Sequence, residues 1–291
     1  MSVRHLSELQ EDIDSVYHED RLGKNETFRG YIANKKFSIP ESFPDAESIV
    51  ILATRTPLAL VDFHHKGETY EIMLPPQYYD DGTTEQQIED IVLRKVIGEP
   101  GHKVEKASTQ LFLKRLAVRS GLGRYGRNNL CYVDGMGSLL TLHAYFTDYI
   151  FQEDSWREVE MMEKCRDCRI CMRDCLQGSI RQDVFVIDVD KCVTLYNEIE
   201  GEFPEWIDPD AHNSLMGCMR CQLRCPANRD VVQKTLRLQD ISEEETEAIL
   251  EQRGDVKLLE SLSEKLRGFA PTQSLDTFSI FTRNLRVLID Q

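Results

Sequence analysis

Apolar positions in the first half of the chain follow two different periods. The β-branched run at residues 48–53 predicts a buried strand, and the apolar residues at 139–146 suit a second strand. Between them, residues 86–97 and 109–119 carry apolar side chains at helical spacing. Helices mixed with a few strands indicate a layered α/β arrangement for this part of the chain.

The pattern after residue 230 is helical. Ser242 and Glu245 have the spacing of a capping box ahead of a helix that runs through Leu250. A further helical stretch covers residues 257–266, and residues 281–289 form a last expected element. The sequence therefore predicts a short helical segment at this end.

Cysteines are concentrated in the middle of the chain. Eight of the nine lie between Cys165 and Cys225. This window divides the chain into three expected parts, at residues 1–160, 161–230 and 231–291. We expect an α/β domain, a cysteine-rich domain inserted after it, and a helical segment that packs back on the first domain.

The spacing of these cysteines predicts iron–sulfur clusters. The C-x2-C-x2-C-x3-C run from Cys165 to Cys175 is the bacterial ferredoxin spacing, in which three thiolates bind one [4Fe–4S] cluster and the fourth binds the other. The C-x2-C-x3-C-P run from Cys218 repeats this pattern without its first member, because Leu215 stands at that position. Cys192 is free to supply the missing thiolate.

This count gives eight ligands for two clusters. The predicted ligands of the first cluster are Cys165, Cys168, Cys171 and Cys225. The predicted ligands of the second cluster are Cys175, Cys192, Cys218 and Cys221. A pair of zinc sites is the alternative, since C-x2-C pairs also bind zinc. Four cysteines within eleven residues and the C-x3-C-P end favour iron–sulfur.

Net charge and apolar runs bear on the partners and the cellular location of the protein. The chain has 35 Lys+Arg against 50 Asp+Glu, a net charge of −15 that repels phosphate backbones and argues against nucleic acid as a partner. No export signal is recognisable, and no apolar run approaches the roughly 20 residues of a membrane span. We expect a cytoplasmic protein without a membrane partner, in which clustered thiols stay reduced and bind metal.

Arginines interleave with the cysteines of this acidic chain. They either serve surface solubility or offset the negative charge of thiolate-bound clusters and present a positive face to an acidic electron donor such as a ferredoxin or flavodoxin. They are Arg166, Arg169, Arg173, Arg220 and Arg224.

With this cysteine order, the chain resembles the epoxyqueuosine reductases and, more distantly, the corrinoid reductive dehalogenases. The segments that carry the resemblance are CMRCQLRCPANR at 218–229, DKCVTL at 190–195, SGLGRYGRNNL at 120–130, GS at 137–138, PDAESIVIL at 44–52 and TRNLR at 282–286. The resemblance implies an α+β fold. A nitroreductase-like α/β domain at 1–160 would bind a base-off corrinoid (cobalamin) and the substrate, the ferredoxin-like two-[4Fe–4S] domain at 161–230 would be inserted, and the nearer cluster would pass electrons to cobalt.

The glycine loop at 120–130 allows two interpretations. Its G-x-G-x-x-G spacing is formally a dinucleotide fingerprint, but that fingerprint needs a preceding strand, and the residues before this loop are helical. Gly121 is better explained as a left-handed residue just after the helix. We prefer a loop that approaches a large cofactor closely. The predicted corrinoid contacts are Gly121, Gly123, Arg124, Tyr125 and Arg127.

The proton donor departs from the family pattern. The family presents a carboxylic acid just before the helix that precedes this loop, where Ala107 stands and Glu105 is the nearest acid. Glu105 and Tyr79 are the predicted catalytic residues, with Tyr78 and Tyr125 as other tyrosine candidates. Cys131, outside the window, is expected to be a small buried hydrophobic residue.

Two functions follow from these features. The first is a reductase that relays single electrons through two [4Fe–4S] clusters to a corrinoid, which reduces a small-molecule substrate. The negative charge, the missing acid and the lack of a helical-repeat extension after Arg229 predict no action on tRNA. The alternative is an electron-transfer or corrinoid-activating protein without a substrate of its own.

Overall fold

The computed structural model describes residues 1–18, 23–107, 111–182, 186–274 and 277–291, which form two compact units. Unit 1 comprises residues 1–55, 82–168 and 183–188, and unit 2 comprises residues 56–81, 169–182 and 189–291. The predicted first domain, 1–160, therefore contributes to both units, as does the predicted cysteine-rich domain, 161–230. The predicted helical segment, 231–291, lies wholly in unit 2.

A three-stranded antiparallel sheet forms the centre of unit 1. Its order is β1 (Ser48–Arg55), β7 (Leu140–Thr147) and β4 (Val104–Lys106). The register runs from Ser48 opposite Thr147 to Arg55 opposite Leu140. The strands predicted at 48–53 and 139–146 are confirmed.

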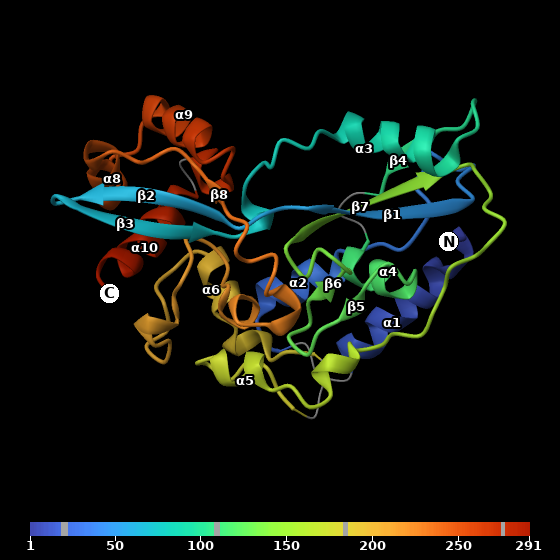
Figure 1. Ribbon diagram of the computed structural model, residues 1–291, viewed down its shortest axis with the longest axis horizontal. Helices are drawn as coiled ribbons and strands as arrows, with labels where there is room; N and C mark the ends of the chain where they lie inside the picture. Colours follow the sequence, from blue (N-terminus) through green and yellow to red (C-terminus); the bar gives the residue numbers. More distant parts are fainter. Residues whose placement is uncertain (19–22, 108–110, 183–185, 275–276) are drawn as a thin grey trace. The chain divides into compact units, whose positions relative to one another are not determined.

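Both faces of this sheet are covered by helices, as Figure 1 shows. Ile49 and Phe146 face a core shared with α1 (Leu6–His18) and α4 (Leu113–Arg119). Val50 and Tyr145 face the opposite core. There they meet α3 (Glu85–Ile91) and the π-helical turn Val92–Ile97 that continues it. Side chains alternate between the faces of a strand, so one apolar run supplies both cores.

The remaining elements of unit 1 are short. Helix α2 (Glu26–Ala33) is capped by the Asn25 side chain. The small hairpin of β5 (Arg124–Tyr125) and β6 (Cys131–Tyr132) follows α4. The helix predicted at 109–119 is observed from Leu113 onward, and residues 108–110 lie outside the described residues.

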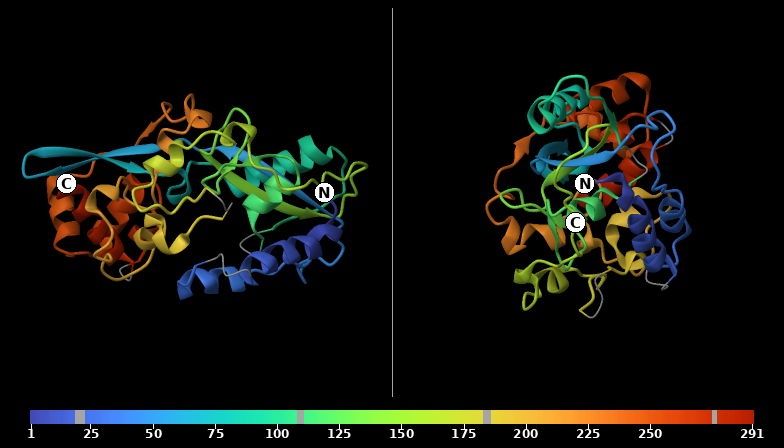
Figure 2. Two further views of the ribbon diagram at one scale, coloured as in Figure 1. Left: turned by 90° about the horizontal axis from the view of Figure 1, so that it is seen from below. Right: turned by 90° about the vertical axis from the view of Figure 1, so that its right-hand side faces the viewer.

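Unit 2 is built on a long hairpin. Strands β2 (Ala59–His65) and β3 (Glu68–Leu74) pair along their whole length, and Figure 2 shows them as an extended ribbon. Lys66 and Gly67 form the two-residue turn with φ of 53° and 77°, as a right-twisted hairpin requires. Strand β8 (Leu236–Arg237) adds to β2 in parallel.

The C-terminal helices of unit 2 are α8 (Glu243–Leu250), α9 (Val256–Lys265) and α10 (Phe278–Ile289). The capping box predicted at Ser242 and Glu245 is confirmed, with both of its hydrogen bonds present. The helices predicted at 257–266 and 281–289 correspond to α9 and α10. The cysteine-rich part adds α5 (Ile170–Asp174), α6 (Val193–Glu198) and α7 (Arg220–Leu223).

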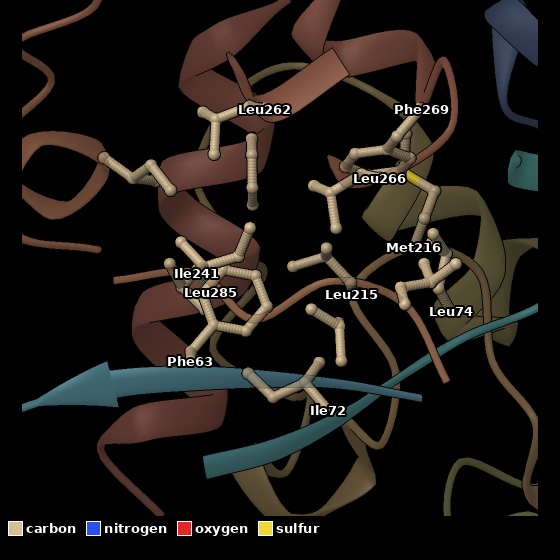
Figure 3. Close-up of a cluster of buried hydrophobic side chains, with 14 of the residues drawn as sticks. Phe63, Ile72, Leu74, Leu215, Met216, Ile241, Leu262, Leu266, Phe269 and Leu285 are labelled. Carbon is tan, nitrogen blue, oxygen red and sulfur yellow. The ribbon is translucent and has the colours of Figure 1, made fainter. Parts of the chain in front are cut away.

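One apolar core unites these parts of unit 2. Figure 3 shows Phe63 and Ile72 from the hairpin packed with Leu262 and Leu285 from the helices and Leu215 from the cysteine-rich part. Burying side chains of this size contributes about 1.5–3 kcal/mol each. The cysteine-rich loop before Cys218 is therefore anchored in the main core of its unit. No helix among the described residues is long and apolar enough to cross a membrane.

Candidate metal centre

The eight cysteines of the window are partly buried thiols that lie within or close to short helical turns. Cys171 lies in α5 and Cys175 ends it. Cys192 precedes α6, and Cys221 lies in α7. Cys165 and Cys168 belong to unit 1 and the other six to unit 2.

Three predicted ligands of the second cluster lie near one another in unit 2. Burial raises the pKa of the Cys192 thiol, and the neighbouring thiols of Cys218 and Cys175 raise it further. Burial likewise raises the pKa of Cys218, and Cys175 adds to the rise. Gathered and partly buried thiols are a donor set that fits a thiolate-bound cluster.

The position of the missing cysteine is part of the hydrophobic core. Leu215 is fully buried, and its backbone N–H donates to the Met73 carbonyl at 2.8 Å. A ligand at this position would point into the core shown in Figure 3. The geometry therefore agrees with a fourth thiolate from another segment, such as Cys192.

Buried amides hold the loop before Cys218 in place. Asn197 of α6 donates to the Gly217 carbonyl at 2.7 Å. Asn284 of α10 donates to the carbonyls of Leu215 at 3.0 Å and Asn197 at 2.9 Å. His212 contacts the Asn197 Oδ1 atom at 3.0 Å. Because these groups satisfy buried backbone carbonyls, they fix the loop relative to α6 and α10.

The arginines between the cysteines have different surroundings. Arg224 pairs with Asp174 at 3.1 Å, and Arg220 donates to the backbone carbonyls of Ala211 and Asp210. Arg166 and Arg173 are exposed. Some of these cations therefore support the local fold, while others face solvent.

The glycine loop packs against its own hairpin. Gly121 follows α4 in the left-handed conformation, with φ of 81°, as predicted. A Cβ atom at Gly123 would lie 2.6 Å from Cys131 Sγ and 2.8 Å from the Tyr132 carbonyl oxygen. Cys131 is buried at 4% exposure, as expected. Gly123 thus permits close packing against β6.

The polar residues of the glycine loop are divided between core and surface. Arg124 is exposed, whereas Tyr125 is buried, and this burial raises the pKa of its hydroxyl far above the usual value. Arg127 donates to the carbonyls of Cys165 at 2.7 Å and Arg166 at 3.4 Å. The loop is therefore tied to the first cysteine of the window, and Arg124 is its accessible cation.

The predicted proton donors lie in different settings. Glu105 is partly exposed on β4 and accepts a hydrogen bond from the Ser42 hydroxyl at 2.7 Å, whereas Ala107 is buried in the core. The Tyr79 hydroxyl donates to the Pro57 carbonyl, and burial raises its pKa to about 12. Glu105 is thus more accessible than Tyr79.

Tyr78, one of the tyrosine candidates, has a partner beside the second-cluster thiols that sequence reasoning missed. The Tyr78 hydroxyl donates to Glu198, and burial together with this carboxylate raises the Tyr78 pKa. Burial also raises the pKa of Glu198. Cys192 contributes to the Tyr78 shift, which places the pair near that thiol. Sequence alone offered no motif for Glu198.

The case for iron–sulfur clusters also rests on a family model. Residues 164–228, which include all eight cysteines, match the family described as 4Fe-4S double cluster binding domain. Among the described side chains, no three His, Cys, Asp or Glu converge on a single ion site. The case for clusters rests on thiol spacing and on this match.

Known relatives and solved structures include proteins similar to this chain in sequence and in fold. The chain is 34% identical to the epoxyqueuosine reductase of Escherichia coli K12 over 123 residues. Those residues are 42% of this chain and 31% of that protein, so the aligned part spans about a third of the relative. The structure of epoxyqueuosine reductase from Streptococcus thermophilus is similar with a TM-score of 0.68 and 18% identity, covering 99% of this chain and 75% of that one.

A second solved structure corrects one expectation. An epoxyqueuosine reductase bound to a modified tRNA-Tyr stem loop is similar with a TM-score of 0.61 and 16% identity, covering 98% of this chain and 81% of that one. The sequence-based exclusion of nucleic acid was therefore wrong. A net charge of −15 sums over the whole chain, whereas RNA meets only a local surface. Together, the thiols, the family match and these relatives show that the chain resembles the epoxyqueuosine reductases and carries a segment similar to the double 4Fe-4S cluster binding domain.

Proposed function

We propose that this chain is an iron–sulfur oxidoreductase that passes single electrons through its two [4Fe–4S] clusters to a corrinoid and reduces a modified base in tRNA. The strongest support is the likeness in fold to epoxyqueuosine reductases over 99% of the chain, together with the double-cluster match at 164–228. We infer the substrate class from the tRNA stem loop that is bound in a related structure.

The ligand sets are those given by the spacing of the cysteines. Cys175, Cys192, Cys218 and Cys221 would bind the second cluster within unit 2, and the other four cysteines of the window would bind the first. An acidic ferredoxin or flavodoxin would donate electrons, drawn by exposed cations such as Arg173.

The residues of the glycine loop fit a corrinoid only in part. Gly123 is covered by Cys131, whereas the exposed Arg124 is placed to bind a polar group of the cofactor. The bound corrinoid would supply the reductive chemistry at the substrate, and the protein would supply position and electron access. Glu105 is the acid that we propose for protonation, because it is partly exposed and Tyr79 is buried.

The test uses the full chain reconstituted with iron, sulfide and cobalamin under anaerobic conditions. Reduced protein is incubated with epoxyqueuosine-containing tRNA, and queuosine is measured by mass spectrometry of the nucleosides. We expect conversion that requires both clusters. Failure of fully reduced, two-cluster protein to convert the base would contradict the proposal, and retention of cobalamin without conversion would favour a corrinoid-activating protein. Glu105→Gln should lower turnover without changing iron content, with Glu41→Gln as the exposed control.

A further inference from the structure

An asparagine side chain lies beside one predicted ligand of the second cluster. The Asn213 Nδ2 atom donates to Cys218 Sγ at 3.2 Å and to the Ala211 carbonyl at 3.0 Å. Its Oδ1 atom accepts from the Met219 backbone N–H at 2.8 Å. Because the carbonyl end of the amide is held by an N–H donor, the NH2 end must face the sulfur.

A threonine lies close in sequence to another ligand. Burial raises the pKa of the Cys192 thiol, and the hydroxyl and backbone N–H of Thr194, two residues along the chain, lower it. The Arg220 backbone N–H does the same for Cys218. Asn213 is therefore a side-chain donor of defined geometry to Cys218, and Thr194 acts in the same direction on Cys192, in a part of unit 2 where burial disfavours charge.

Donors to thiolate sulfur act on the electron equilibrium of a cluster. Reduction adds one negative charge that spreads over the cluster and its sulfurs, and a hydrogen bond stabilises the more negative state more strongly. This difference is larger where burial excludes water. Such donors therefore raise the reduction potential, and their removal lowers it.

We propose that Asn213 sets the reduction potential of the second cluster through its hydrogen bond to Cys218, and that Thr194 adds to this effect beside Cys192. The inference rests on the proposed function in one respect, which is that these two cysteines bind a cluster. Asn213 and Thr194 are positioning residues, since they act through the ligands. They keep the second cluster easier to reduce than its thiolate ligands and surroundings alone would.

The experiment measures midpoint potentials by paramagnetic resonance during redox titration of the reconstituted chain. Thr194→Val keeps the shape and the backbone N–H of residue 194 and removes only the hydroxyl. Asn213→Leu removes the amide donor. Ser214→Ala is the matched control, because the Ser214 hydroxyl is buried in the same loop and donates to the Met216 carbonyl rather than to sulfur.

We expect each of the two variants to lower the second-cluster potential, while the first-cluster potential and the Ser214→Ala variant stay unchanged. Losing one donor should shift the reduction equilibrium by about tenfold, which is about 59 mV for a one-electron couple. If Asn213→Leu fails to fold or to hold the cluster, the Thr194→Val potential decides the matter. Unchanged potentials in protein that holds two clusters would overturn this inference, whereas wild-type protein without two clusters would overturn the proposed function instead.

Discussion

Two loops carry the residues that the sequence marks for chemistry, and they are held in different ways. The glycine loop of unit 1, residues 120–130, is held by close packing of Gly123 against Cys131 and by the Arg127 side chain, which donates to the Cys165 carbonyl. The cysteine loop of unit 2, residues 213–219, is held by side-chain amides from α6 and α10. The first loop combines the missing side chain of Gly123 with one arginine, whereas the second depends on several amide side chains at buried carbonyls.

This difference shows the structural role that each motif has within its own unit. At Gly123 the missing side chain allows two backbone segments of the same unit to approach. Cysteines need their sulfurs held at fixed positions while other polar groups are satisfied, which buried amides achieve. A glycine motif is therefore weaker support for a binding site than a cysteine motif supported by an amide network.

The largest effect is expected from removing a ligand. Cys192→Ala leaves the second cluster one thiolate short, because Leu215 occupies the core position where a motif cysteine would stand. We expect about half of the iron content and loss of one paramagnetic signal after dithionite reduction. Cys131→Ala is the matched control, since this buried cysteine lies outside the cluster window. Full two-cluster content in Cys192→Ala would remove Cys192 from the ligand set.

The glycine loop is tested by adding one methyl group. Gly123→Ala would place a Cβ 2.6 Å from Cys131 Sγ and 2.8 Å from a backbone oxygen, so the hairpin must shift. We expect a loss of about 3 kcal/mol in the free energy of unfolding, measured by urea titration.

Gly30→Ala is the control for this variant, because its Cβ meets nothing within 4 Å in helix α2. That variant should be equally or slightly more stable than wild type. If Gly123→Ala is as stable as wild type but binds cobalamin more weakly, the loop holds the cofactor rather than the hairpin.

Local signals in the sequence predicted much of the fold. The strand at 48–53 was recognisable because its β-branched residues are buried in the cores on both faces of the sheet, and α8 because its capping box is complete within four residues. The β2–β3 hairpin was not predicted, although Val61 and Phe63 alternate with polar residues. Its association with the C-terminal helices depends on contacts between distant residues, such as the parallel pairing of β2 with β8, which local patterns do not encode.

The candidate site was predictable to a similar degree. The spacing of cluster-binding cysteines is visible within a short stretch of sequence, so the eight candidate cysteines were recognisable without the structure. Asn213, Asn197 and Asn284 have no such signature, because an amide acquires its role only from the carbonyl or sulfur that folding brings near it. Net charge is a poor guide to a nucleic-acid partner, because it averages over both units while RNA meets a local surface.

Restoring a cysteine at position 215 tests whether this position can supply a cluster ligand. Leu215→Cys replaces a fully buried leucine in the core of unit 2 with a smaller side chain. We expect a loss of about 2 kcal/mol in the free energy of unfolding, and no rescue of cluster content in the Leu215→Cys/Cys192→Ala double variant. Restoration of the second paramagnetic signal would show that position 215 can turn toward the cluster.

The smallest effect concerns the pH dependence of the amide network. Burial, with a contribution from Arg283, lowers the pKa of His212 from 6.5 to about 4, so the folded protein holds this imidazole neutral beside Asn197. The unfolded chain binds a proton near pH 6.5 and the folded chain only near pH 4, so the histidine costs stability progressively as the pH falls through this range.

The His212→Gln variant tests this dependence, because glutamine cannot be protonated and its amide can still donate to Asn197. We expect wild type to exceed the variant in thermal stability at pH 7 and to lose that advantage toward pH 5, measured by thermal unfolding of both proteins. A difference that stays constant over this pH range would mean that His212 stabilises the loop before Cys218 by packing against Phe203 alone.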